Sequence, residues 1–322
     1  MKIPLLLMLV AVTAALSVLL GRDVADLGAL FGQGDAVEYW RYIIFELRLP
    51  RVLMAILIGA MLASSGLLFQ STLHNPLASP FTLGSSAGAA LGAYIAFLVF
   101  GPGSQWLFIG FAFGLALLVS LPIYLLAARR RVPPEAVLLA GVAITFGTSA
   151  VISGLTYVAS EKTIFAYARW SLGDLSVIGY DNILILLVPT LLPVIYGWLA
   201  RHRLDAMAGG EELALARGVN IAAVRSGALL VVTIGVGASV ALCGPIAFIG
   251  LIVPHVARAI YGGGHSRLTI AAPLLGAILL MLCDFAGRNI LTVDIPIGVM
   301  TAALGTPAFI ALLVTRLGRA RG

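Results

Sequence analysis

The chain has 322 residues, of which 61% are hydrophobic and only 11% are charged, and its mean hydropathy is +1.07. A soluble domain carries about 25% charged residues, so this composition excludes an ordinary soluble protein and predicts one that lies in a membrane. The formal net charge of +6 does not indicate nucleic-acid binding, because the basic residues are scattered through short loops.

Apolar segments of about 20 residues, each long enough to cross roughly 30 Å of hydrocarbon, recur along the whole chain. In chain order we expect ten helices, at residues 3–20, 50–70, 83–100, 106–128, 135–158, 183–200, 226–243, 246–261, 270–285 and 295–315. The first follows Lys2 and is predicted to be a retained span rather than a signal peptide, because residues 17–22 offer no clear small-x-small cleavage site. We therefore predict an all-α polytopic membrane protein with one transmembrane domain over residues 1–322.

The distribution of basic residues predicts the orientation. Because ten is an even number, both termini are expected on the same side of the membrane. That side would hold 13 of the 20 basic residues: Lys2, Arg129, Arg130, Arg131, Arg201, Arg203, Arg217, Arg225, Arg258, Arg267, Arg316, Arg319 and Arg321. The other would hold the remaining 7: Arg22, Arg41, Arg48, Arg51, Lys162, Arg169 and Arg288. The richer side is predicted to be cytoplasmic.

Small residues predict where helices pack closely. Gly84, Gly88 and Gly92 are spaced by four and predict that one face of the third helix is pressed against a neighbour. Residues 59–66 and 237–244 share a Gly-Ala-x-x-Ala-x-x-Gly pattern. This pattern fits either an internal repeat, as in many transporters, or independent sites of close packing, and the residues do not decide between them.

A polar, helix-prone insert at residues 210–219 separates two long apolar segments. Acidic residues open it and a basic residue closes it, which suits a helix dipole, and a glycine can terminate the turn. A short exposed helix is marginal in water, so we expect it to be held by a soluble partner, the alternative being a simple solvated connection. The predicted contact residues are Glu211, Glu212, Leu213, Ala214, Ala216, Arg217 and Gly218.

Several motifs are those of a known family. They are Leu-Arg-Leu-Pro-Arg at 47–51, His-Asn-Pro-Leu-Ala-Ser-Pro-Phe-Thr-Leu-Gly at 74–84, Leu-Ala-Gly-Val-Ala at 139–143, the insert at 210–219, the Gly-Pro-Ile-Ala-Phe-Ile-Gly run with Pro-His at 244–258, and Ile-Pro-Ile-Gly-Val at 295–299. In order and spacing they resemble the permease subunits of bacterial ABC importers for vitamin B12, ferric siderophores and haem. The resemblance covers nearly the whole chain and implies type II ABC importer permease architecture.

The resemblance also implies residue roles. The loop at about 201–220 would be the cytoplasmic coupling helix, which inserts into an ATP-binding subunit. Asn75, Leu77 and Leu138 would form the cytoplasmic gate, although Pro133-Pro134-Glu135 departs from the hydroxyl residues of the vitamin B12 permease. Arg48, Arg51 and Arg288 would dock a periplasmic substrate-binding protein, the alternative being arginines that reach the membrane interface.

The implied assembly is a homodimer, or a pair with a paralogous permease, in the bacterial cytoplasmic (inner) membrane, with both termini cytoplasmic. Two ATP-binding subunits would carry ATP and Mg, and this chain is expected to bind no cofactor, metal or nucleic acid. It has no Gly-x-x-x-x-Gly-Lys-Ser/Thr phosphate loop, so it is not expected to hydrolyse ATP or to act as an enzyme. The expected cargo is a metal chelate: ferric siderophore, haem or cobalamin.

Two other functions remain open from the residues alone. An ion- or proton-coupled secondary transporter would need acids inside its spans, and the clear candidate, Asp284, lies near a span end. Asp284 and Arg288 are spaced i, i+4, so an ion pair within the helix competes with docking by Arg288. A membrane-embedded enzyme would need a nucleophile or a metal cluster, which the sequence does not display. Cys243 and Cys283 are predicted to be buried apolar residues.

Overall fold

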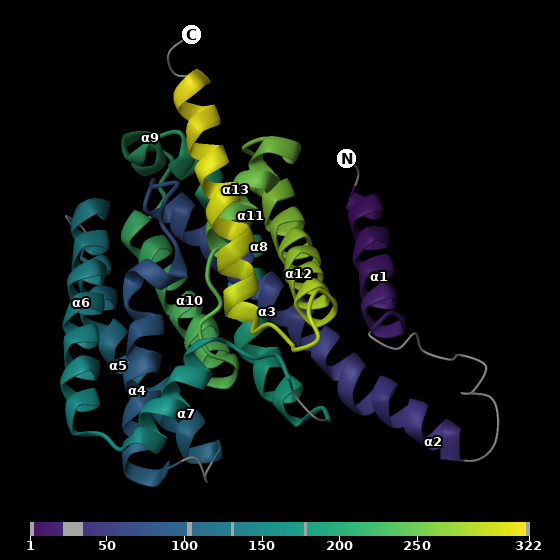
Figure 1. Ribbon diagram of the computed structural model, residues 1–322. Coiled ribbons are helices and arrows are strands. Elements are labelled where there is room, and N and C mark those ends of the chain that lie inside the picture. The colour runs from purple at the N-terminus through teal and green to yellow at the C-terminus, as the bar shows by residue number, and fades with distance from the viewer. Residues whose placement is uncertain (1–2, 22–34, 102–104, 130–131, 177–178, 320–322) are drawn as a thin grey trace.

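The computed structural model describes residues 3–21, 35–101, 105–129, 132–176 and 179–319, and within them the secondary structure is helical without strands (Figure 1). The predicted positions of Lys2, Arg22, Arg130, Arg131 and Arg321 lie outside the described residues. Figure 1 shows a bundle of helices with α9 and the C-terminal end of α13 at its upper end and α7 at its lower end. The structure confirms an all-helical fold.

Each of the ten predicted segments coincides largely with a helix. The matching helices are α1 (Ile3–Leu19), α3 (Leu49–Thr72), α4 (Ser85–Phe100), α5 (Gln105–Ala127), α6 (Pro134–Val158), α8 (Asp181–Ala208), α10 (Ile221–Cys243), α11 (Ile249–Tyr261), α12 (His265–Asn289) and α13 (Ile297–Arg319). Within the described chain, 6 helices are long and apolar enough to cross a membrane, and α1, α4, α11 and α13 are shorter apolar helices. Ten spans therefore remain a prediction.

Several predicted boundaries were wrong. The loop expected at about 201–220 begins later, because α8 continues to Ala208 and carries Arg201 and Arg203 on its last turns. Helix α10 begins at Ile221, where the Asn220 side chain accepts a hydrogen bond from the Ala223 amide. A further helix, α7 (Glu161–Ser171), was not predicted, because polar residues alternate with its apolar ones and it contains no long apolar run.

The second predicted helix begins well before Pro50, since α2 (Asp35–Arg41) and the π-helix η2 (Tyr42–Arg48) run directly into α3. Pro50 has no N–H, so it cannot donate a hydrogen bond to the turn before it. That turn belongs to the π-helix η2, in which each hydrogen bond spans five residues, and the amide of Leu49 donates to the carbonyl of Ile44. The Tyr180 hydroxyl donates to the Phe45 carbonyl at 2.7 Å and the Gly179 amide to the Glu46 carbonyl at 3.1 Å. These two bonds fasten the start of α8 to η2, which continues into α3.

Glycines let α3 lie at the centre of the bundle. A Cβ at Gly59 would collide with the backbone of Gly276 in α12, and one at Gly66 with the backbone of Gly250 in α11. The stripe predicted on the third helix is confirmed for Gly88 and Gly92, because Cβ atoms there would collide with the backbone of α5. Gly84 instead caps the beginning of α4 at φ 78° and faces the side chain of Ile144 in α6. The cysteines Cys243 and Cys283 are buried and free, as predicted.

Candidate functional site

Two polar clusters lie at opposite ends of α3. Arg51 is near its beginning and Thr72 is its last residue, 21 residues later. At 1.5 Å per residue, these positions are about 30 Å apart along the helix axis, close to the thickness of a hydrocarbon core. The cluster at Arg51 will be called the arginine cluster, and the end at Thr72 will be called the α9 end.

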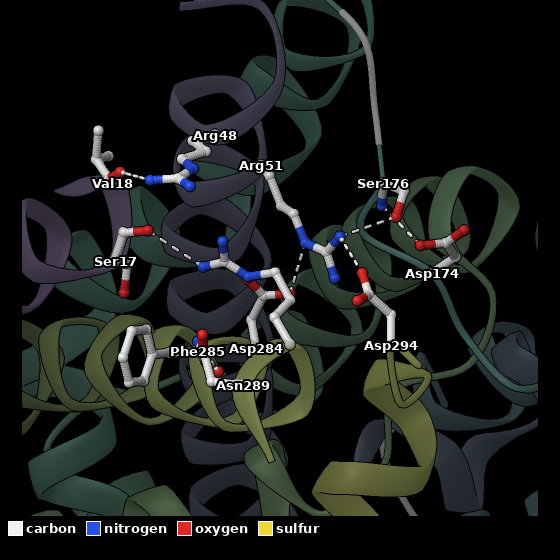
Figure 2. A network of polar contacts seen from close by, with 11 residues as sticks. Ser17, Val18, Arg48, Arg51, Asp174, Ser176, Asp284, Phe285, Asn289 and Asp294 are labelled. Carbon is white, nitrogen blue, oxygen red and sulfur yellow. Dashed lines mark hydrogen bonds and ion pairs between the residues drawn. The ribbon is translucent and has the colours of Figure 1, made fainter. Parts of the chain in front are cut away.

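Asp284 is the centre of the arginine cluster. Its Oδ1 lies 2.8 Å from Nε of Arg51, and its Oδ2 lies 3.0 Å from Nε of Arg288. Figure 2 shows Arg51 extended from α3 toward Asp284, with Asp294 and Ser176 on its other side. The carboxylate is 2% exposed and the two guanidinium side chains are 13% and 11% exposed. One buried acid therefore balances two arginines from different helices.

The remaining contacts of the arginine cluster connect Arg51 to two loops. Nη1 of Arg51 donates to Oγ of Ser176 at 3.0 Å and lies 3.5 Å from Oδ2 of the half-exposed Asp294. Asp174 accepts the amide of Ser176 at 2.7 Å, which fixes that loop (Figure 2). A cavity of about 390 Å³ opens beside these groups and is also lined by Arg169 of α7.

The structure brings the three predicted docking arginines to one end of the molecule but turns them inward. Arg48 donates to the carbonyls of Val18 and Leu19 at the end of α1, at 3.0 and 3.3 Å. Arg288 donates to the carbonyl of Ser17 at 3.3 Å. The predicted ion pair between Asp284 and Arg288 is confirmed, and the docking role stays a prediction. Arg169, which is exposed at the same end, was missed because no helix was expected there.

At the other end, the predicted short helix in the insert is confirmed as α9 (Glu211–Ala216). Gly210 and Gly218 flank it with φ values of 109° and 75°, in the region that favours glycine, although both have open space around them. The glycines are therefore required by the backbone turns rather than by close packing.

The side chains of α9 divide into an inner and an outer set. Ala214 is fully buried, so it anchors the helix instead of offering a contact surface. Glu212, Ala216, Arg217 and Gly218 are exposed. Leu213 and Leu215 are 42% and 61% exposed. Leu215 was not among the predicted contacts, although its position between two predicted ones could have indicated it.

Arg225 at the beginning of α10 holds α9 to the bundle, a role that the sequence did not reveal. Its Nη2 donates to Oε1 of Glu211 at 2.7 Å. Its Nη1 donates to the carbonyl of Val132 at 3.0 Å, and its Nε donates to the carbonyl of Thr72 at 3.3 Å. The residue is 3% exposed. A cavity of about 360 Å³ lies beside it, lined by Arg129, Glu211 and Leu215 among others.

The predicted gate residues Asn75 and Leu77 follow closely after Thr72, whose carbonyl Arg225 binds. The Asn75 side chain accepts the amide of Leu77 at 2.8 Å, which makes a tight turn, and Leu77 is exposed. His74, at φ 47°, donates from Nε2 to the carbonyl of Met207 near the end of α8 at 2.8 Å. Leu138 lies on α6 and packs partly buried against the core. The gate itself stays a prediction.

A second polar chain joins three helices at the same end. Ser71 Oγ lies 2.7 Å from Nε2 of His265, and Nδ1 of His265 lies 2.8 Å from Oδ1 of Asp205. The same carboxylate oxygen accepts the amide of His265, so Asp205 of α8 caps the beginning of α12. The neighbouring cavity of about 320 Å³ is lined also by Arg258, whose guanidinium donates to the Gln70 side chain. Gln70 itself bonds to the backbone of α11.

Comparison with known proteins places this arrangement in a family. The chain is 34% identical over 318 residues to the hemin transport system permease protein of Yersinia pestis, covering 96% of this chain and 94% of that one. It is 37% identical over 283 residues to the vitamin B12 import system permease protein of Yersinia enterocolitica, covering 86% and 83% of the two chains. A solved structure described as an inward-facing conformation of a metal-chelate type ABC transporter superposes with a TM-score of 0.84 at 31% identity, over 97% of this chain and 98% of that one.

The sequence profile described as the FecCD transport family matches residues 5–315, which is nearly the whole chain. The chain belongs to the FecCD transport family.

Proposed function

We propose that this chain is the membrane-spanning subunit of an ATP-driven importer that moves a metal chelate across the cytoplasmic membrane by alternating access. A partner ATPase would hold ATP and Mg, grip α9, and change which end of the bundle is open. Ferric siderophore, haem and cobalamin are the proposed cargo class, by analogy with the relatives. Two copies of the chain, or this chain and a paralogue, would enclose the pathway.

The geometry of α9 is the observation that carries this proposal. The helix exposes Leu213 and Leu215, while Glu211 and the buried Ala214 fasten it to the bundle. Exposed leucines on a short anchored helix suit insertion into an apolar cleft of a soluble protein. The predicted gate residues Asn75 and Leu77 follow α3 directly at this same end.

At the opposite end, we propose that a periplasmic binding protein docks beside the arginine cluster. Arg169 is exposed next to the cavity that Arg51 and Asp294 also line, so it offers positive charge to acidic residues of a partner. The guanidinium groups of Arg48, Arg51 and Arg288 are bonded within the chain. These three arginines would therefore support the docking surface by holding its helices and loops in place instead of contacting the partner.

A proton-coupled mechanism finds less support. Asp284, the acid that it would use, is already paired with two arginines. Reconstitution separates the two functions. Vesicles that contain the chain with its partner ATPase should take up a labelled ferric hydroxamate, ferric catecholate, haem or cobalamin only when ATP is supplied. The cognate binding protein delivers the cargo in this experiment. Collapse of the proton gradient should not change this uptake. Uptake that follows the gradient without the ATPase would reject the proposal.

A further inference from the structure

Arg225 joins three segments that are far apart in the sequence. Each of its three guanidinium nitrogens donates to a different one: Nε to the Thr72 carbonyl, Nη1 to the Val132 carbonyl and Nη2 to the Glu211 carboxylate. Because a guanidinium is planar and rigid, the three acceptors are held at fixed positions relative to one another. Lysine, with a single charged nitrogen on a flexible stem, could not reproduce this fork.

The three segments are α9 and the two segments that lead to the predicted gate residues. Thr72 is the last residue of α3, three residues before Asn75. Val132 lies six residues before Leu138, in the short segment that leads into α6. Glu211 is the first residue of α9. One buried side chain thus connects the helix that the ATPase is proposed to grip with both segments of the predicted gate.

The bonds at Arg225 favour joint movement over separation. A buried arginine charge is costly when it loses its partner, so Glu211 and Arg225 are expected to move together. The Thr72 carbonyl is at the C-terminus of α3, where a positive charge interacts favourably with the helix dipole. The bond from His74 to the Met207 carbonyl supplies a second link between the gate loop and the helix before α9.

We propose that Arg225 is the positioning residue through which displacement of α9 reaches the gate segments. This inference rests on the proposed function, because it assigns the route by which the ATPase would act on the bundle. Arg225, Glu211, the end of α3 and the segment before α6 would move as one rigid unit. A purely structural role for Arg225 would stabilise the chain without affecting how much cargo moves for each ATP hydrolysed.

The first measurement compares Arg225→Lys with wild type in vesicles that contain the partner ATPase, using the labelled chelate that wild type takes up best. Arg225→Lys keeps the charge near Glu211 and removes the fork. We expect assembly and ATP hydrolysis to persist and uptake per ATP to fall by about tenfold, within the usual range of coupling between sites. Glu211→Gln should lower the same ratio, and the matched control Arg203→Lys, on an exposed arginine of α8, should leave it unchanged.

The second measurement needs no variant of Arg225. Cys243 and Cys283 are buried, so spin labels on Leu77→Cys and Ala216→Cys, in one labelled copy diluted among unlabelled copies, report one intrachain distance. A rigid unit keeps that distance unchanged when ATP is added. A distance that changes with ATP, or wild-type uptake per ATP in Arg225→Lys, would overturn the inference. Absence of any ATP-dependent uptake in wild type would instead overturn the proposed function.

Discussion

Single charged residues at the ends of the bundle hold segments together because each has several partners. Asp284 neutralises two arginines at one end, and Arg225 satisfies a carboxylate and two carbonyls at the other. Burial of a charge is tolerated only when such partners compensate for the lost water. Removal of one member therefore leaves another buried and uncompensated, which costs more than the bond itself contributes.

Asp284→Asn should strongly destabilise the chain. The substitution keeps the shape of the side chain but removes the charge that balances Arg51 and Arg288, so we expect a loss of about 3–5 kcal/mol in the free energy of unfolding. The fall in thermal midpoint of the purified protein in detergent measures this loss. Asp294→Asn is the matched control: its side chain is 51% exposed and 3.5 Å from Arg51, so its loss should stay below about 1 kcal/mol. Equal losses would contradict the central role of Asp284.

Charge partners close in sequence could be predicted, and distant ones could not. The pair of Asp284 and Arg288 follows from the i, i+4 geometry of a helix. Asp284 is 233 residues from Arg51, and Arg225 is 153 residues from Thr72, so only the tertiary fold brings these groups together. The three arginines predicted to dock a binding protein lie at one end of the bundle, but the residue pattern did not indicate that they face inward.

At the scale of helices, small residues determine how closely the elements approach. Helix α3 crosses α11 and α12 at glycines, and α4 meets α5 in the same way. In a membrane, such contacts replace the hydrophobic effect that drives helix association in water. The shared pattern at residues 59–66 and 237–244 has different surroundings in its two places, because Gly59 meets backbone whereas Gly237 meets the side chains of Ala116 and Phe113.

Gly66→Ala tests this close packing. The new Cβ would collide with the backbone of Gly250, which cannot turn aside as a side chain can, so we expect α3 and α11 to separate at a cost of about 1–3 kcal/mol or more. Gly114→Ala in α5 is the matched control, because its Cβ would have no neighbour within 4 Å. Alanine is also the better helix former, so this control should be neutral or slightly stabilising. Thermal unfolding of the two variants in the same detergent compares them; similar midpoints would count against backbone contact at Gly66.

Helix α9 provides a prediction about assembly. Leu213→Ser together with Leu215→Ser removes the exposed apolar surface without touching Glu211 or the buried Ala214. Association with the partner ATPase should weaken by about 2 kcal/mol or more, which is roughly a thirtyfold rise in the dissociation constant. Titration of the detergent-solubilised chain with the ATPase measures this rise. Leu118→Ser and Leu125→Ser, on exposed positions of α5, are the control pair. A dissociation constant that stays at the wild-type value would remove α9 from the interface.

Helix positions were predictable, whereas many helix ends were not. Long apolar runs located each predicted segment, but α8 extends past its apolar part to Ala208 because arginines are compatible with a helix that leaves the membrane. The helix α7 was missed since its apolar residues, including Tyr167 and Trp170, contact α4 and α5 rather than forming a long apolar run. Hydropathy detects burial in lipid and is insensitive to helices that pack on one face only.

For the whole molecule, the ends of the bundle differ in charge. Among the described residues, Arg129, Arg203, Arg217 and Arg267 belong to the α9 end together with the acids Asp205, Glu211 and Glu212, and the opposite end holds arginines with acids such as Asp284 and Asp294. Figure 1 also shows the C-terminal end of α13 at the same end of the bundle as α9. The excess of basic residues therefore predicts that the α9 end faces the cytoplasm.

Cysteine labelling from each side of the membrane tests this orientation. Cys243 and Cys283 are buried, so a membrane-impermeant maleimide should react only with introduced cysteines. Lys162→Cys on α7 should be labelled in intact spheroplasts, because α7 lies at the end opposite α9. Arg203→Cys near the end of α8 should be labelled only in inverted vesicles or after the membrane is opened. If Arg203→Cys reacted in intact spheroplasts, α9 would face outward, where no ATP-hydrolysing partner could reach it, and the transport proposal would fail together with the orientation.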